Sequence, residues 1–328
     1  MDERSQKKVL DILRVLNESD RPLGGTRIAQ SLQLAGRDMS QRTIRYYLKR
    51  TDEDGLTESV GRRGRRLTHR GRRELQNAGA VDKVGYIGAR VDELTYRMNF
   101  RLRPAQGQVV VNLSSLEASR LGEASAVMRQ VFESGLSMGD RLLVAGPGRH
   151  LAGHRVGTGQ YTVATICSVS VNGVLLQAGI PASNRFGGLL QMMDGKPFRF
   201  TQIIHYNGTT LDPLEIFIKG RMTSVGRAAR TGNGQVGASF REIPAPCAEA
   251  ARRLNVRMQK IGMGGILLVG RPGQPLLEVP VPPGRVGLVV IGGLNPLAAV
   301  EEAGIATENT ALGALMPYEE LKHFQTML

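Results

Sequence analysis

Residues 40–49 combine base-reading and phosphate-binding side chains at helical spacing. Ile44, Tyr47 and Leu48 lie at positions i, i+3 and i+4, which predicts the buried face of a short helix. The outward face then carries six polar side chains, namely Ser40, Gln41, Arg42, Arg45, Tyr46 and Lys49. Arginine can pair with guanine and glutamine with adenine through two hydrogen bonds, whereas lysine and hydroxyl groups suit phosphate oxygens. The segment is therefore predicted to be a DNA-reading helix.

A second basic cluster follows within twelve residues of this helix. Gly61 and Gly64 permit a tight hairpin tip, and the arginines beside them are Arg62, Arg63, Arg65 and Arg66. Such arginines can bind phosphates or enter a narrow minor groove, where the negative potential is enhanced. The alternative is that the two clusters form a solvated basic face that serves a protein contact.

The second part of the chain holds two glycine-rich candidates for a small-anion site. Residues 286–296 read as a strand, a glycine turn and a helix start, so the free N–H groups near Gly293 and Asn295 could bind a carboxylate. Alternatively, the glycines only let strand and helix pack closely. The other candidate offers a cation, a hydroxyl group and close backbone approach at Arg155, Gly157, Thr158 and Gly159.

Arg241 is a further candidate for contact with an anion. It is followed directly by Glu242, so two interpretations stay open from the sequence alone. The guanidinium either pairs with its neighbouring carboxylate or meets a carboxylate of a ligand.

The elements that must position these residues suggest two domains and an α+β fold class. Helices are expected over residues 5–18, 25–34, 40–54 and 68–78, with an extended hairpin over 56–67, which is the order of a winged helix-turn-helix. After Gly79 glycine becomes dense and β-branched runs appear. We therefore expect a DNA-binding domain over residues 1–79 and a larger, mixed α+β effector-sensing and dimerisation domain over residues 80–328.

Individual elements of the larger domain are less clearly patterned. Residues 83–89, 107–113, 215–222 and 276–281 read as strands, and residues 116–132 as a helix. The apolar segment 161–178 exceeds most strands in length and is predicted to be a buried helix. Residues 173–181 weakly echo 265–272, which we interpret as two unrelated apolar segments rather than as a duplication.

Charge and composition restrict the partners and the class of protein. The chain has 328 residues and a net charge of +14, and its first 80 residues carry 18 basic against 11 acidic side chains. This excess favours an anionic partner. Two cysteines in a chain of this length favour a reducing cytoplasm, and no apolar run of about 18 residues predicts a membrane span. No phosphate-binding loop or metal-ligand spacing is present, so neither an enzyme, a metal nor a cofactor is predicted.

Several motifs resemble the NrpR family of nitrogen-regulatory repressors. Residues 39–49, 54–56, 61–65 and 67–71 are similar to its winged helix, which is related to one associated with ribonuclease R. The resemblance of the larger domain covers roughly residues 82–320, and its motifs are 159–163, 167–169, 172–176, 179–181, 186–190, 208–215, 238–244 and 292–296. Cys167 and Asp212 lie in two of these motifs, which adds them to the candidate ligand-binding residues.

The resemblance implies a specific function for the chain. Members of the family are expected to bind a palindromic operator upstream of nitrogen-assimilation genes and to be released by 2-oxoglutarate, a small dicarboxylate effector. A palindromic DNA site matches a two-fold protein, so we expect a homodimer held by the effector domain. Two alternatives remain, namely a winged-helix regulator that senses another metabolite, and an enzyme with a tethered regulatory domain.

Overall fold

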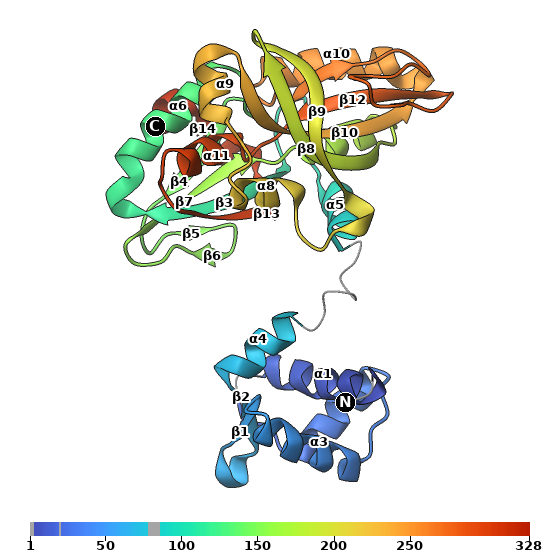
Figure 1. Cartoon of the computed structure of the whole chain (residues 1–328), viewed down its shortest axis with the longest axis vertical. Coiled ribbons are helices and arrows are strands. Elements are labelled where there is room, and N and C mark those ends of the chain that lie inside the picture. The colour runs from blue at the N-terminus through green and yellow to red at the C-terminus, as the bar shows by residue number, and fades with distance from the viewer. Residues whose placement is uncertain (1–2, 20, 78–85) are drawn as a thin grey trace. The chain divides into compact units, whose positions relative to one another are not determined.

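The chain divides into two units, Met1–Val84 and Gly85–Leu328, whose buried hydrophobic clusters are separate. This computed structural model describes residues 3–19, 21–77 and 86–328 (Figure 1). The domain boundary expected between residues 79 and 80 lies outside the described residues. Within them, no helix is both long enough and apolar enough to cross a membrane.

The first unit is a winged helix-turn-helix, as the sequence predicts. Three helices precede a two-stranded hairpin and a closing helix. In chain order the elements are α1 (Glu3–Asn17), α2 (Gly25–Leu34), α3 (Gln41–Glu53), β1 (Thr57–Ser59), the short 3-10 turn η1 (Gly61–Arg63), β2 (Arg65–Leu67) and α4 (His69–Asn77).

Burial of the apolar helix faces holds this unit together. Ile12 and Leu13 of α1, Ile28 of α2, and Ile44 and Leu48 of α3 are all almost fully buried in one cluster. Each such side chain contributes about 1.5–3 kcal/mol when it leaves water. The predicted inward face of α3 is therefore confirmed, and this packing fixes which side of α3 remains exposed.

A glycine lets the hairpin lie close to the chain that precedes α2. Leu23 pairs with Arg65 through two backbone hydrogen bonds of 2.9 Å. Gly64 has a φ of 112°, and a Cβ atom there would lie 2.3 Å from the carbonyl of Leu23. Only glycine fits this position without displacing the backbone.

The second unit contains two antiparallel five-stranded sheets (Figure 1). The strand order of one sheet is β13-β3-β7-β4-β14 and that of the other is β11-β12-β10-β8-β9. The strands of the first are β3 (Gln108–Glu117), β4 (Arg141–Ala145), β7 (Gln160–Ile166), β13 (Thr307–Pro317) and β14 (Lys322–His323). Those of the second are β8 (Ser183–Met193), β9 (Lys196–His205), β10 (Gly234–Pro244), β11 (Ile266–Val269) and β12 (Arg285–Ile291).

Helices and one small hairpin complete the second unit, which gives it the expected α+β class. The hairpin consists of β5 (His150–Leu151) and β6 (His154–Arg155). The helices are α5 (Tyr86–Arg97), α6 (Leu121–Glu133), α7 (Ser170–Gln177), α8 (Pro213–Lys219), α9 (Val225–Thr231), α10 (Ala248–Lys260), α11 (Asn295–Glu302) and α12 (Phe324–Met327).

The second unit is an internal duplication. The order β3-α6-β4-β7-α7-β8 is repeated as β10-α10-β11-β12-α11-β13. Residues 178–180 and 303–305 both read Ala-Gly-Ile, and residues 142–144 and 267–269 both read Leu-Leu-Val. The weak echo between residues 173–181 and 265–272 joins α7 to β11, which are not equivalent. These two segments are therefore unrelated, as interpreted from the sequence. The duplication that does exist matches α7 with α11 and β4 with β11.

The two halves exchange their last strands. β8 of the first half pairs with β10 in the sheet of the second half, and β13 of the second half pairs with β3 in the sheet of the first. Each sheet is consequently complete only when both halves are present.

Four of the expected elements are wrong. The segment 161–178 is not one helix, because β7 ends at Ile166 and a turn leads into α7. The run expected as a strand over 215–222 instead forms α8 as far as Lys219 and then a turn, since Asp212 caps the helix and Pro213 fixes its first turn. Of the strand expected over 83–89, residues 86–89 are helical, and residues 83–85 lie outside the described residues. Residues 276–281 form only an isolated bridge between Leu276 and Val279.

Candidate nucleic-acid interface and ligand sites

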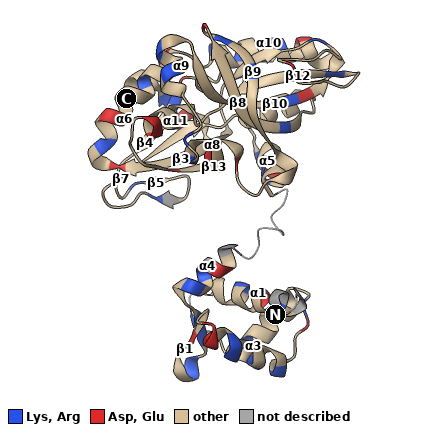
Figure 2. Ribbon diagram, in the orientation of Figure 1, with Lys and Arg blue, Asp and Glu red and all other residues tan. Residues whose placement is uncertain are grey.

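The outward face of α3 presents a nearly acid-free polar surface. Five of the six residues predicted to face DNA are exposed on the helix itself, namely Gln41, Arg42, Arg45, Tyr46 and Lys49. The ribbon of α3 is blue at its lysine and arginine positions in Figure 2. Among the described residues, Arg42 and Arg45 have no ion-pair or hydrogen-bond partner, so both guanidinium groups are free to bind. Lys49 lies 3.9 Å from the Glu53 carboxylate, with both side chains largely exposed.

The hydroxyl group of Ser40 is already engaged in a hydrogen bond at the start of α3. Its hydroxyl group accepts a hydrogen bond of 3.1 Å from the backbone N–H of Thr43 and so caps α3. Ser40 therefore positions the helix start, whether or not it also contacts a phosphate.

The four arginines of the hairpin divide into two pairs. Arg62 and Arg63 lie at the exposed tip and have no ion partner in the described part of the chain. Arg65 instead forms a 2.7 Å ion pair with Asp52 of α3, and Arg66 forms one of 2.6 Å with Glu58. The tip pair is thus free for an external anion, whereas Arg65 also ties the hairpin to α3.

The nine candidate ligand residues fall into two separate groups. Five are buried near the starts of α7, α8 and α11 and along β10, namely Cys167, Asp212, Arg241, Gly293 and Asn295. The other four lie in an exposed segment that includes the end of the β5–β6 hairpin, namely Arg155, Gly157, Thr158 and Gly159. The structure therefore does not bring all nine together.

The buried group surrounds the centre of the duplication. The Ser170 hydroxyl at the start of α7 both accepts from the N–H of Val110 and donates to its carbonyl, at 3.0 and 2.9 Å. Asn295 at the start of α11 makes the same two bonds to Gly237, at 2.8 and 3.0 Å. Since the remaining Asn295 N–H donates to the carbonyl of Leu136, its amide is fully used in holding helix to strand.

Gly293 also has a packing role. A Cβ atom at this position would lie 2.0 Å from the carbonyl oxygen of Ile166, the last residue of β7, so only glycine lets the chain before α11 lie this close to the strand end. This geometry favours the packing interpretation for Gly293 and Asn295.

Arg241 is a buried cation without a carboxylate partner in the described residues. It is 1% exposed, and its guanidinium donates to the carbonyl and hydroxyl oxygens of Ser168, at 2.9 and 3.0 Å, and to the hydroxyl of Ser239 at 3.3 Å. Its Nε atom has no partner. Burial lowers the pKa of this guanidinium. A buried charge without an opposite charge is costly, so an anionic ligand would stabilise it.

The neighbouring acid does not pair with Arg241. Glu242 instead forms ion pairs with Arg185 and with Arg285, the latter at 3.8 Å. Of the two interpretations left open by the sequence, the pairing of Arg241 with Glu242 is therefore excluded.

Asp212 is a buried carboxyl group that also caps α8. It accepts a hydrogen bond of 2.9 Å from the backbone N–H of Leu214. Burial, followed by repulsion from Glu215, raises the pKa of Asp212 to about 7. The group can therefore be protonated near neutral pH. Burial also raises the pKa of Cys167 to about 11, which makes it a thiol rather than a nucleophilic thiolate.

Replacement of Asp212 by Asn is expected to stabilise the chain above pH 7. Because its folded-state pKa is raised above the ordinary value of 3.8, the wild-type chain loses stability as pH rises from about 4 to 7. One proton corresponds to a slope of at most about 1.4 kcal/mol per pH unit. Asn keeps the helix cap but does not ionise. Urea unfolding at pH 4, 6 and 8 would measure the difference, with the exposed Asp92→Asn as control. Equal free energies of unfolding at pH 8 would contradict the assignment.

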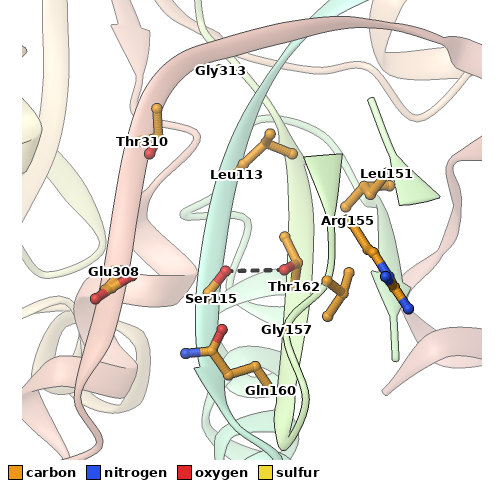
Figure 3. A pocket seen from close by; sticks show the side chains of 11 residues that line it. Leu113, Ser115, Leu151, Arg155, Gly157, Gln160, Thr162, Glu308, Thr310 and Gly313 are labelled. Carbon is orange, nitrogen blue, oxygen red and sulfur yellow. Dashed lines mark hydrogen bonds between the residues drawn. The ribbon is translucent and has the colours of Figure 1, made fainter. Parts of the chain in front are cut away.

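A pocket of about 200 Å³ lies beside the exposed group of candidates (Figure 3). Its wall includes Arg155 and Gly157, whereas Thr158 and Gly159 do not line it. The remaining lining residues are Leu113, Ser115, Leu151, Val156, Gln160, Thr162, Glu308, Thr310 and Gly313.

Some residues of these sites were missed by the sequence analysis. Ser168 and Ser239 hold Arg241, and Glu308 and Thr310 line the pocket from β13. Ser168 directly follows Cys167 in the family motif over residues 167–169. Glu308 could have been found only through the duplication, because it reaches the pocket by exchange of β13. In the described residues no group of three acidic, histidine or cysteine side chains could hold a metal ion.

Two family models match the chain in sequence. The model described as NrpR regulatory domains NRD1 and 2 matches residues 84–323, and the ribonuclease R winged-helix domain matches residues 10–75.

Similar proteins carry related descriptions. The global nitrogen regulator NrpRI of Methanosarcina mazei is 33% identical over 98% of this chain and 99% of its own length. The global nitrogen regulators NrpR of Methanococcus maripaludis and Methanocaldococcus jannaschii are each 30% identical, over 92% and 96% of this chain. The chain spans about half of these two longer proteins, 52% and 54% respectively.

One solved structure shares the architecture. The crystal structure of a nitrogen repressor-like protein from Methanococcus jannaschii superposes with a TM-score of 0.60 at 26% sequence identity. The match covers 72% of this chain and 97% of that one.

Proposed function

The chain belongs to the NrpR family of nitrogen regulators, and from this premise we propose that it is a transcriptional repressor of nitrogen-assimilation genes that 2-oxoglutarate releases from its operator. The observation that carries the proposal is the presence, in one chain, of a winged helix with a free basic face and of the family's regulatory domain. The first unit would bind double-stranded DNA and the second would sense the effector.

The DNA-binding role rests on two sets of exposed arginines in the first unit, one on α3 and one at the hairpin tip. Arg42 and Arg45 are exposed on α3 and unpaired among the described residues, so they can reach base edges in a major groove. Arg62 and Arg63 at the hairpin tip are equally available for phosphates or a minor groove.

The effector role rests on Arg241 and its surroundings. We infer that one carboxylate of 2-oxoglutarate pairs with this guanidinium, which otherwise has only neutral acceptors. Asp212, whose pKa is raised to about 7, would be partly protonated and could then approach the dianion without repulsion.

A homodimer fits this function. A single winged helix reads only a half-site, so two copies related by a two-fold axis match a palindromic operator. The basic first units repel one another, which makes the second unit the better candidate for the contact.

The proposal predicts that operator and effector weaken each other's binding equally. An allosteric coupling of about 1–3 kcal/mol corresponds to roughly 5- to 150-fold weaker operator binding when 2-oxoglutarate is saturating. Calorimetry of 2-oxoglutarate with the free chain, and with the chain on a duplex obtained by binding-site selection, would measure the reciprocal effect. Light scattering of the complex would give two chains per duplex.

Other outcomes would separate the remaining hypotheses. Equal affinities for 2-oxoglutarate in the two titrations would contradict the release mechanism. DNA binding without any binding of 2-oxoglutarate would favour a regulator of another metabolite. Failure of selection to enrich any duplex would count against a repressor and in favour of an enzyme with a tethered domain.

A further inference from the structure

The pocket beside the β5–β6 hairpin is distinct from the buried site around Arg241. Its polar lining comes from three strands of one sheet, namely Ser115 of β3, Thr162 and Gln160 of β7, and Thr310 of β13. The hydroxyl groups of Ser115 and Thr162 lie 3.0 Å apart and hydrogen-bond to each other (Figure 3). At about 200 Å³ the pocket is smaller than the roughly 300–1,000 Å³ typical of drug-sized ligands, so it suits a small metabolite.

Two opposite charges line this pocket without a partner. Glu308 on β13 and Arg155 on β6 stand on opposite sides of it (Figure 3). In the described part of the chain neither side chain forms an ion pair or a hydrogen bond, and both are exposed. A ligand that carries both a cation and a carboxylate could satisfy the two groups at once.

The duplication shows what fills the equivalent place in the other half. In that half, Glu242 of β10 pairs across the strands with Ser183 of β8 and Gly287 of β12. In the first half, Ser115 of β3 pairs in the same way with Glu308 of β13 and Thr162 of β7. The equivalent of Thr310 is Arg185 and that of Gln160 is Arg285, by position in the repeat.

In that second half the charges are satisfied internally. The guanidinium groups of Arg185 and Arg285 both pair with the carboxylate of Glu242, and Arg285 also donates to the Ser183 hydroxyl at 2.8 Å. In the first half the two arginines are replaced by shorter, uncharged side chains while a carboxylate remains, now at Glu308. The guanidinium groups of Arg185 and Arg285 thus have no equivalent in the open pocket, where Arg155 comes instead from the β5–β6 hairpin.

We propose that the pocket binds a free α-amino acid with a polar side chain. The ammonium group of the ligand takes the place of the missing guanidinium against Glu308, and its carboxylate pairs with Arg155. The hydroxyl and amide groups of Ser115, Thr162, Thr310 and Gln160 hold the ligand's polar side chain. Glu308 disfavours a dicarboxylate such as 2-oxoglutarate here, because like charges repel.

Calorimetry with L-glutamine as probe tests this proposal on the full chain. We expect measurable binding of L-glutamine, and at least about tenfold weaker binding of two analogues that each lack one charge. These are 4-aminobutanamide, which has no carboxylate, and 2-oxoglutaramate, which has no ammonium group. Absence of L-glutamine binding at millimolar concentration, or equal binding of all three compounds, would overturn the proposal.

Variants of the pocket provide a second, independent measurement. Glu308→Gln and Arg155→Met change exposed side chains and are each expected to weaken L-glutamine binding at least about tenfold. Thr310→Arg introduces the arginine of the equivalent half, which should pair with Glu308 and abolish binding. Arg185→Met in the equivalent half is the matched control and should leave binding unchanged. Unaltered binding by both Glu308→Gln and Arg155→Met would place the amino acid elsewhere and refute the assignment.

Discussion

Charge reversal of the two tip arginines, Arg62→Glu with Arg63→Glu, is expected to weaken operator binding by at least about 100-fold. Each arginine that pairs with a phosphate forms a charge-assisted hydrogen bond worth about 1.5–3 kcal/mol, and every 1.4 kcal/mol is tenfold. Both side chains are exposed and have no acidic partner among the described residues, so the substitution leaves the fold of the hairpin intact. Fluorescence anisotropy with a labelled operator duplex would measure the loss.

The control for net charge is a matched pair on the second unit. Arg253→Glu with Arg257→Glu, on exposed positions of α10, makes the same change in total charge. We expect this control to bind within a few fold of wild type. The tip variant should also reduce the slope of log K against log salt by about 2, because two phosphate contacts are lost. An equal loss in both double variants would show that net charge, not the hairpin, determines binding.

Recognition by α3 should respond differently from binding by the hairpin. Arg42→Ala or Arg45→Ala is expected to cost about 1–3 kcal/mol and to relax preference at one base position, provided the side chain pairs with a base. Binding-site selection distinguishes this result from the uniform weakening expected for the tip variant.

Replacement of Arg241 by Met is expected to make operator binding insensitive to 2-oxoglutarate. The change removes the guanidinium that we infer to hold a ligand carboxylate, and the concentration needed for release should rise by at least about tenfold. Binding to the operator without effector should persist. The chain should unfold at the same or a higher temperature, because Met fills the buried space without an uncompensated charge.

Two controls accompany the Arg241 experiment. Arg185→Met removes a guanidinium from the same sheet, but one that pairs with Glu242, and should leave the effector response intact. Arg241→Lys keeps the charge but not the forked donor and should give an intermediate response. Release of Arg241→Met from the operator at the wild-type 2-oxoglutarate concentration would exclude Arg241 from the effector site.

The winged helix could be predicted almost entirely from its sequence, because its signals are local. Ile44, Tyr47 and Leu48 repeat at helical spacing, Ser40 is a good helix cap, and Gly64 marks the hairpin. Each of these signals acts within a few residues, and all agree on the same fold. Once the buried face of α3 was predicted from this spacing, the opposite face of the helix was predicted to be exposed.

The second unit could be predicted only in part, because its strands pair over long distances. The length of the segment over 161–178 favours a helix, but Cys167–Val169 separates a strand from a helix within it. Asp212 and Pro213 did carry a helix-start signal, but the apolar run after them was read as a strand.

The ligand candidates show the same limit. The sequence shows that Arg241 and Glu242 are neighbours. It could not reveal that Glu242 pairs instead with Arg185 and Arg285, which lie 57 and 43 residues away along the chain. It likewise grouped Arg155 with Arg241 as possible anion contacts, whereas the fold puts one at an open pocket and the other in a core.

The exchange of β8 and β13 sets an order in which the chain can fold as it is synthesised. The first unit has all its described residues once residue 77 has left the ribosome, whereas β3 cannot meet β13 until residues 307–317 have followed. At about 5–20 residues per second, that interval is roughly 10–50 seconds. Once β3 has been synthesised it keeps an unpaired edge for the rest of this interval, and an unpaired strand edge favours aggregation. We therefore expect the winged-helix unit to be folded well before the second unit, which we propose to be its sensor.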